Sequence, residues 1–315
     1  MSQSQGVILG AYPTAPSFHQ KGQEQEIAFY QALATNQDVR GLEQPFHETL
    51  HPYGTEFLLN HIPQHWEIVV TAISETMRLR KENPAFGLAS TNEESRQACL
   101  RYYRHMFEAI NRINDQYQNK KVIALQIHSA PDKSNSSVEQ ATAAFYESMK
   151  TLKSWDWSCP LVIEHCDSMT GISPRKAFLP LDKDIEVAKE FDISICLNWA
   201  RSVLETKNPA EMLAHVKQTA KAGVLKAVMF SGTAPSGSYG EWDDLHVPFA
   251  PFAGCQVQCP ESLMTQENAA EIFAAIDPST LLYLGAKLLE SNANATLEHR
   301  LAIMNDGVLA IKKSL

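Results

Sequence analysis

The 315-residue sequence has no run of about 18 uncharged apolar residues, which is near the length that a membrane-spanning helix requires. Its first residues also lack the basic segment and the following apolar segment of a secretory signal peptide. The sequence therefore predicts neither a transmembrane helix nor a secretion signal, and we expect a cytoplasmic protein.

Basic residues are too few to predict a nucleic-acid-binding surface. Lysine and arginine total 27 against 36 aspartate and glutamate residues, which gives a formal net charge of -9. A net negative charge repels phosphate groups. We therefore expect no nucleic-acid or membrane partner. The sequence leaves the oligomeric state open, a homo-oligomer included.

Glycine/serine linkers, low-complexity tracts and internal repeats are also missing, and the six cysteines are scattered. Scattered cysteines within apolar segments indicate free thiols rather than a disulfide framework. The segment GAYPTAP, after the first apolar run, lacks the glycine pattern of a dinucleotide-binding fold. These absences predict one domain over residues 1–315.

Eight short, mostly apolar segments alternate with amphipathic segments along the chain. Such strands are typical of a parallel sheet covered on both faces, and eight strand–helix alternations close most simply into a barrel. The sequence therefore predicts an α/β fold, a single-domain (β/α)8 TIM barrel. The expected strands are residues 6–12, 39–43, 66–72, 121–128, 160–165, 193–199, 225–231 and 281–287. The expected helices are residues 24–34, 55–62, 93–118, 137–153, 181–191, 209–222, 266–276 and 294–313, with 73–91 as the longest connection.

Polar side chains stand where most of these apolar segments end. In a barrel the chemistry collects at the carboxyl ends of the strands. Any one of these side chains alone is better explained as a capping or loop-tying residue, but several at one rim indicate a site. The candidates are Tyr12, Glu43, His128, Glu164, His165, Asn198, Arg201 and Lys287.

Several segments resemble successive parts of the xylose-isomerase-like TIM barrels. They are GLEQP, VIALQIHSAP with the helix-rich segment before it, PLVIEH and ISICLNWAR. That superfamily contains sugar isomerases, ketose epimerases and type IV AP endonucleases. The resemblance indicates a branch classified as a domain of unknown function. It implies an enzyme of carbohydrate metabolism.

In these barrels a divalent metal is usually held by acids after strands five, six and eight and a histidine after strand seven, with another histidine after strand four nearby. Glu164 and His128 match this pattern, whereas Asn198, Ser231 and Lys287 depart from it. A lysine in place of an acid repels a cation. The departures weaken the case for a metal and disfavour AP endonuclease chemistry.

Residues 232–254 form a long segment after the seventh expected strand. Its glycines and aromatic residues predict a lid over the barrel mouth, with Trp242 against the ligand. An acid in the lid, either Asp243 or Asp244, could restore a site for Zn, Mn or Mg. That metal shell would consist of Glu164, His165, Asp243 and His246. The competing interpretation is a solvated loop whose aspartates cap a turn.

The segment from His47 to His51 matches the HExxH pattern of zinc metallopeptidases. On a helix the two histidines would bind zinc and the glutamate would polarise water. Pro52 obstructs a helix directly after the motif, and Phe57 stands where the longer motif requires a third histidine. This is the least favoured alternative, and we expect His51 in a loop on the substrate side.

The favoured function is a sugar isomerase- or epimerase-like proton transfer next to a carbonyl. Glu164 would act as base or metal ligand, with His128 and His165 moving protons, and Lys287 or Arg201 would stabilise the enediolate. The expected substrate-binding residues are Tyr12, Glu43, His51, Asn198, Arg201 and Trp242. The alternatives are a barrel that binds carbohydrate without turnover and a metal-free lyase or hydrolase.

Overall fold

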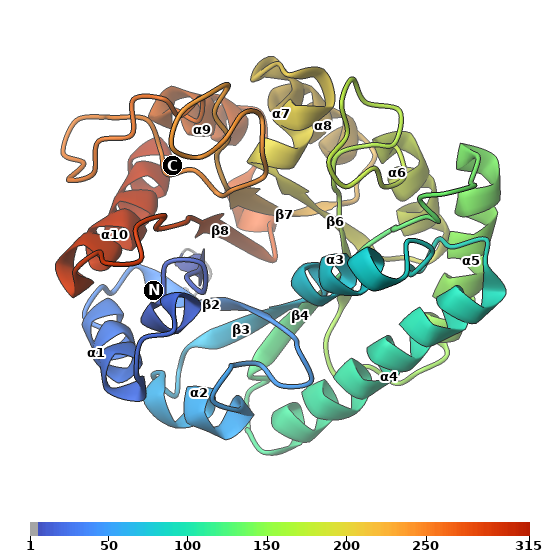
Figure 1. Ribbon diagram of the computed structural model, residues 1–315, viewed down its shortest axis with the longest axis horizontal. Coiled ribbons are helices and arrows are strands. Elements are labelled where there is room, and N and C mark those ends of the chain that lie inside the picture. The colour runs from blue at the N-terminus through green and yellow to red at the C-terminus, as the bar shows by residue number, and fades with distance from the viewer. Residues whose placement is uncertain (1–5) are drawn as a thin grey trace.

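The computed structural model describes residues 6–315 and contains a closed barrel of eight parallel strands in chain order (Figure 1). The last strand pairs with the first and closes the barrel. The predicted single-domain (β/α)8 TIM barrel is therefore confirmed. The strands are β1 (Val7–Gly10), β2 (Val39–Pro45), β3 (Glu67–Thr71), β4 (Val122–Ile127), β5 (Leu161–Glu164), β6 (Ser194–Asn198), β7 (Leu225–Phe230) and β8 (Tyr283–Lys287).

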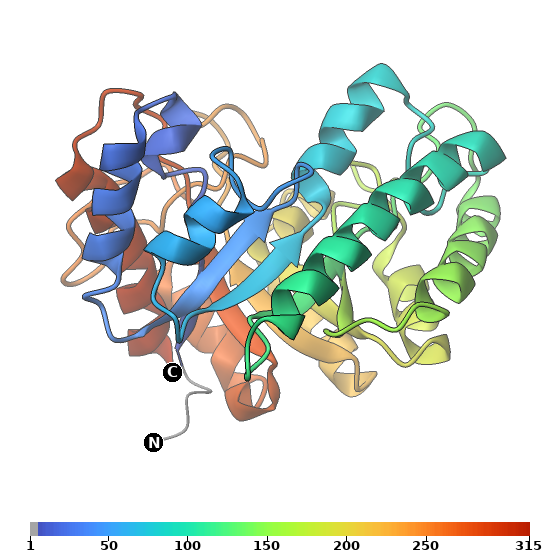
Figure 2. The same cartoon turned by 90° about the horizontal axis from the view of Figure 1, so that it is seen from below.

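Helices surround the barrel, as the two perpendicular views show (Figures 1 and 2). They are α1 (Gln23–Leu33), α2 (Thr55–His61), α3 (Ile73–Glu82), α4 (Glu93–Asp115), α5 (Val138–Lys153), α6 (Leu181–Glu190), α7 (Trp199–Thr206), α8 (Ala210–Lys221), α9 (Gln266–Ala274) and α10 (Leu297–Ser314). Within residues 6–315, no helix is both long and apolar enough to cross a bilayer.

Local sequence explains where the longer helices begin. The side chain of Asn92 accepts a hydrogen bond from the Ser95 amide at the start of α4. Ser137 and Gln140 form a reciprocal capping box at the start of α5. Such caps satisfy amide groups that have no partner within the helix. Both positions agree with the starts expected from the sequence.

Helix α3 corrects the expectation that residues 73–91 form a connection without regular structure. Its buried positions are Ile73, Thr76 and Arg80. Only one of the three is apolar, so the segment carries little of the hydrophobic periodicity from which a helix is predicted. Tertiary packing of the Arg80 guanidinium, which donates to the Phe86 carbonyl oxygen at 3.2 Å, supports the helix instead.

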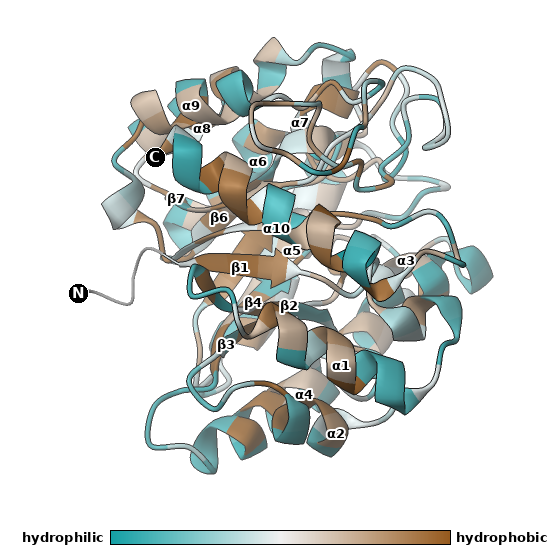
Figure 3. Cartoon of the chain, turned by 90° about the vertical axis from the view of Figure 1, so that its left-hand side faces the viewer, coloured by the Kyte–Doolittle hydropathy of each residue, from teal (hydrophilic) through white to brown (hydrophobic). Residues whose placement is uncertain are grey.

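Side chains fill the barrel interior, which is apolar in its middle and polar near the carboxyl ends of the strands. Figure 3 shows β1 as a hydrophobic strand, whereas the surrounding helices carry both hydrophobic and hydrophilic residues. Gly285 lies where β8 approaches β1, because a Cβ there would come within 2.3 Å of the Ile8 carbonyl oxygen. The apolar interior layer consists of Ile8, Val69, Ala124, Val162, Cys196, Ala227, Met229 and Tyr283.

Candidate active site

A buried charge network lies at the carboxyl ends of the strands, with Glu164 at its centre. Its Oε1 is 2.6 Å from Arg201 Nη1 and 3.8 Å from Lys287 Nζ. Its Oε2 is 2.7 Å from His128 Nε2. The side chains of Glu164, His128 and Lys287 are fully buried. Three of the predicted residues, His128, Arg201 and Lys287, thus meet around the carboxylate of Glu164.

Lys287 connects this carboxylate to a second one. Its Nζ lies 2.5 Å from Glu43 Oε1, and Gln126 Nε2 donates to Glu43 Oε2 at 3.1 Å. The ammonium group also faces the ring of Tyr12, 5.8 Å from its centroid. The network therefore joins the ends of β2, β4, β5 and β8 and lies below Tyr12.

Burial and charge set the protonation states. Burial alone would raise the pKa of Glu164, but the positive charges of Arg201 and Lys287 outweigh it and hold that pKa well below its usual value. Burial lowers the pKa of His128 to about 4, against the hydrogen bond to Glu164. At neutral pH the His128 ring is therefore neutral, and its Nε2–H donates to the Glu164 carboxylate.

The loop after β7 adds two residues to this rim. Asp244 Oδ2 accepts from Arg201 Nε at 3.2 Å and also contacts the ammonium of Lys176. His246 Nδ1 is 2.8 Å from Ser231 Oγ and 3.5 Å from Asp244 Oδ1. Burial lowers the pKa of His246 to about 3, so its ring is neutral. Its φ of 56° lies in the left-handed region, a conformation that surrounding contacts must support.

A cavity of about 240 Å³ lies over this part of the rim. A second cavity of about 410 Å³ adjoins it and shares Tyr12, Phe18 and Ser74 as wall residues. Polar and charged groups on the wall of the smaller cavity are Tyr12, Ser74, Lys176, Arg201, Asp244 and His246. Arg201 thus belongs both to the buried network and to the cavity wall.

Two further predicted residues lie near the rim in different roles. Asn198 is buried, and its side-chain amide has no hydrogen-bond partner among residues 6–315. His51 lines the larger cavity, where its Nε2 is 3.0 Å from Glu26 Oε1. Asn198 therefore has free hydrogen-bonding capacity, whereas His51 is fixed by a buried carboxylate.

Part of the segment expected to form a lid lies at the cavity. Asp244 and His246 face the cavity, but the Trp242 ring packs near Lys207 Nζ, 5.6 Å from the ring centroid, and does not line either cavity. The expectation that Trp242 contacts the ligand is therefore not supported by its position. Trp242 itself adopts a φ of 52°, in the left-handed region.

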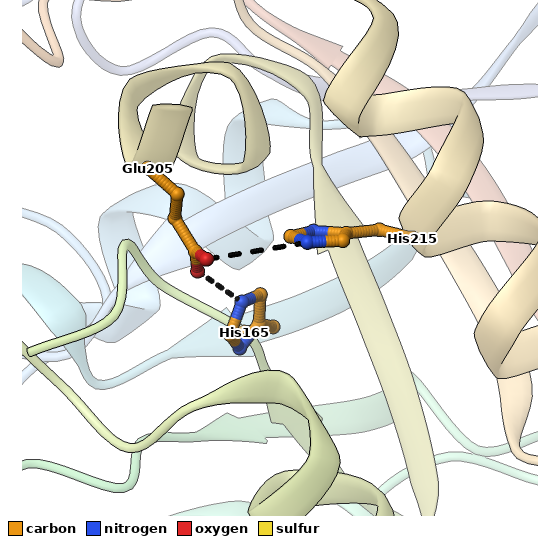
Figure 4. Close-up of side chains that lie close together, drawn as sticks. All are labelled: His165, Glu205 and His215. Atoms are coloured by element: carbon orange, nitrogen blue, oxygen red, sulfur yellow. Dashed lines mark hydrogen bonds and ion pairs between the residues drawn. The ribbon is translucent and has the colours of Figure 1, made fainter. Parts of the chain in front are cut away.

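The expectation that His128, Glu164 and His165 face a common cavity is not met, because none of the three lines either cavity, and His165 also points away from the other two. Its Nδ1 is 2.8 Å from Asp184 Oδ2, and its Nε2 is 2.7 Å from Glu205 Oε1 (Figure 4). Successive residues of a strand point to opposite faces. Because Glu164 points into the barrel, the next residue points toward the helices, and His165 contacts α6 and α7 instead of the rim.

A family model for a domain of unknown function, DUF4862, matches residues 8–303. The chain belongs to the DUF4862 family. A relative from Salmonella typhimurium strain LT2, uncharacterized protein STM3670, is 53% identical over 314 residues, which cover 100% of this chain and 99% of that protein.

The DUF4862 barrel is similar in fold to solved xylose isomerase-like barrels. The IolI protein, solved with a binding zinc atom, matches with a TM-score of 0.61 and 8% identity over 99% of each chain. A xylose isomerase domain-containing protein from Salmonella typhimurium LT2 matches with a TM-score of 0.55 and 12% identity, over 99% of this chain and 98% of that one. At these identities the likeness shows the fold, and it confirms the resemblance that the sequence motifs indicate.

The mouth of the DUF4862 barrel does not fit a divalent metal. Glu164 already faces two cations, Arg201 and Lys287, at distances where they would repel a metal ion. Asp243 turns outward and pairs with Arg175 at 3.0 Å, and His165 lies among the helices. The predicted shell of Glu164, His165, Asp243 and His246 is therefore not brought together.

The HExxH segment of this DUF4862 protein is not helical, so the metallopeptidase alternative is wrong. His47 and Thr49 form a short antiparallel bridge, and Glu48 has a φ of 66°. His47 Nδ1 is 2.7 Å from Glu75 Oε2, whereas His51 binds Glu26. The two histidines have different partners and do not form the zinc-binding pair that the motif requires.

Sequence reasoning missed Lys176 as a rim residue and placed Asp243 in the metal shell, with Asp244 only as an alternative, whereas Asp244 is the residue at the rim. Lys176 lies in an irregular segment between β5 and α6, and its contact with Asp244 joins chain positions far apart in sequence. No local pattern reports such a contact. Strand alternation, in contrast, could have placed His165 correctly from the position of Glu164.

Proposed function

We propose that this DUF4862 protein catalyses a sugar isomerase- or epimerase-like proton transfer next to a carbonyl group, without a metal at the barrel mouth. One observation carries the proposal. Buried cations, Arg201 and Lys287, are held by carboxylates at the carboxyl ends of the strands, and Arg201 reaches a cavity beside a neutral histidine, His246. This arrangement supports a substrate of carbohydrate type, which offers both a carbonyl and several hydroxyl groups.

His246 is the proposed base. Its Nδ1 faces Ser231 Oγ, so Nε2 is the nitrogen that would take the proton from the carbon next to the carbonyl. Asp244, 3.5 Å from Nδ1, would then stabilise the imidazolium. Burial lowers the pKa of the ring, so it is neutral and able to accept a proton before the transfer. The same low pKa makes the imidazole a weak base, so the transfer depends on the stabilisation of the imidazolium by Asp244.

Arg201 would stabilise the enediolate oxygen that forms when the proton leaves. A fixed cation in a buried site stabilises such developing charge more strongly than one in water. Return of the proton to the neighbouring carbon, with transfer of the hydroxyl proton from one enediolate oxygen to the other, gives an isomer. An epimer requires a second proton donor on the face opposite His246. Glu164 holds Arg201 and Lys287 in place and, because it is enclosed by these cations and lines neither cavity, is a positioning residue rather than the base.

The test is exchange of substrate hydrogen with solvent. The protein is incubated with a panel of aldoses, ketoses and polyols in D2O, and deuterium at the carbon next to the carbonyl is measured by mass spectrometry. We expect exchange for at least one sugar, loss of exchange in His246→Asn, and normal exchange in His105→Asn, a variant at an exposed position of α4. Exchange that is unchanged in His246→Asn would refute the assigned base.

A carbohydrate-binding barrel without turnover is the second candidate. The observation that favours it is the complete burial of Glu164 and Lys287, which do not line either cavity. The same panel separates the two functions. A sugar that raises the melting temperature but never exchanges hydrogen would support binding alone.

A further inference from the structure

A cluster of metal-ligating side chains lies apart from the charge network, between the end of β5 and helices α7 and α8. His165 Nε2 is 2.7 Å from Glu205 Oε1, and His215 Nε2 is 4.0 Å from Glu205 Oε2. One ligand atom of each residue lies within 4.8 Å of the others. Figure 4 shows the three side chains pointing toward one another.

A fourth ligand is available on the same helix as His215. Glu211 lies one turn earlier on α8, and its Oε1 is 3.3 Å from His215 Nε2. Its side chain is 26% exposed, and that of Glu205 is 13% exposed, so an ion can enter from solvent. The other ligands are nearly buried, which favours retention once the ion is bound.

The outer contacts of the two histidines are those that metal-binding histidines usually have. His165 Nδ1 faces the carboxylate of Asp184 at 2.8 Å, and His215 Nδ1 faces Ser202 Oγ at 3.0 Å. When each Nδ1–H donates to its oxygen partner, each Nε2 presents a lone pair to the shared centre. Such outer partners fix the ring orientation and make the ligating nitrogen more basic.

We propose that His165, Glu205, His215 and Glu211 form a zinc site that joins helices α7 and α8 to the end of β5. Two imidazole nitrogens with two carboxylates suit Zn²⁺. In a tetrahedral site with metal–ligand bonds of about 2.0–2.1 Å, ligand atoms lie about 3.3 Å apart. The observed separations of 2.7, 3.3 and 4.0 Å lie on both sides of this value, and one ligand atom each of His165, Glu205 and His215 lies within 4.8 Å of the other two. To complete the shell these three side chains must close in on the ion, and Glu211 must turn toward it from its present contacts with His215 and Thr206.

A metal-free arrangement competes with this site. Without an ion, His165 would be a cation between Asp184 and Glu205, and the cluster would be an ion-pair network that holds the helices. The two arrangements differ in metal content and in what a substitution of His215 does, because His215 takes no part in the His165 ion pairs.

The test measures metal binding to the full chain. The purified protein is stripped with a chelator and dialysed against Zn²⁺, and bound zinc is counted by elemental analysis. Co²⁺ replaces Zn²⁺ in a second sample, where visible absorption reports tetrahedral nitrogen and oxygen ligands. We expect one metal ion per chain, a tetrahedral Co²⁺ spectrum, and a higher melting temperature with Zn²⁺.

Variants locate the ion. His215→Gln is expected to lose the bound metal, and Asp184→Asn is expected to weaken binding by about 10- to 100-fold. Glu211→Gln changes a partly exposed side chain, so it keeps the fold and should bind zinc more weakly even if His215→Gln does not fold. His246→Asn is the matched control at the barrel mouth and should bind zinc as the wild type does.

Three results would overturn the proposal: less than one tenth of an equivalent of zinc in the wild type, normal zinc in both His215→Gln and Glu211→Gln, or loss of zinc in His246→Asn alone. The last result would place a metal at the barrel mouth. The hydrogen-exchange assay is independent of this test, because a zinc site among α7 and α8 can fail while proton transfer at His246 persists.

Discussion

Replacing Glu164 with glutamine removes one negative charge from the buried network while keeping nearly the same volume. Arg201 Nη1 at 2.6 Å and Lys287 Nζ at 3.8 Å would then face a neutral amide. Each cation keeps one carboxylate, because Arg201 still contacts Asp244 and Lys287 still contacts Glu43. Asp244 is shared with Lys176, so three cations then face two carboxylates, and one buried positive charge lacks compensation.

The expected cost follows from this count. Removing one partner of a buried ion pair costs about 3–5 kcal/mol of unfolding free energy. The remaining carboxylates place Glu164→Gln at the lower end, about 3 kcal/mol. For a chain of this size, about 2 °C of melting temperature corresponds to 1 kcal/mol, so we expect a decrease of about 6 °C.

Thermal melting at pH 7 measures the effect, with two companion variants. Glu147→Gln breaks an exposed ion pair with Lys150 and should lower stability by at most about 1 kcal/mol. Glu164→Gln combined with Lys287→Met restores charge balance and should be more stable than the sum of the two single changes predicts. A melting temperature within about 1 °C of the wild type for Glu164→Gln, or strict additivity in the double variant, would refute the reasoning.

Three further predictions concern single positions. Burial lowers the pKa of His128 from 6.5 to about 4, so the unfolded chain takes up a proton on this ring at higher pH than the folded chain does. The contribution of His128 to the free energy of unfolding is therefore complete above pH 6.5 and falls by roughly 3 kcal/mol toward pH 4. Denaturant titrations should show a smaller loss of stability at acid pH in His128→Gln than in the wild type. Arg201→Lys cannot span Glu164 and Asp244 together, so we expect a loss of about 2–4 kcal/mol in chemical denaturation, and wild-type stability would contradict the bridging role. Gly285→Ala places a Cβ 2.3 Å from the Ile8 carbonyl oxygen and should fail to give soluble protein, whereas Gly22→Ala, with no atom within 4 Å, should change stability by less than about 1 kcal/mol.

Local patterns in the sequence determined the barrel. Eight apolar segments alternate with amphipathic ones, and a parallel sheet with helices on its outside is the arrangement that buries both. Polar residues after those segments, such as His128 and Glu164, necessarily lie at one rim once the barrel closes. The starts of α4 and α5 can likewise be predicted from adjacent residues, because a capping side chain acts within one helical turn.

Tertiary structure decided which of these side chains meet. Asp244 contacts Arg201, whereas Asp243 pairs with Arg175 in a partly exposed position, and no spacing rule predicts which of these adjacent acids faces the site. Lys287 at the end of β8 contacts Glu43 in β2 across β1, although the two residues lie near opposite ends of the chain.

The histidine after β5 shows the same division between sequence and tertiary structure. Successive side chains of a strand point to opposite faces, so His165 points away from Glu164, and this can be predicted from the sequence alone. Its meeting with His215, fifty positions later, depends on how α7 and α8 pack against the barrel. Periodicity describes neighbours along the chain, whereas a site is made by residues that only the packing of distant elements brings within bonding distance.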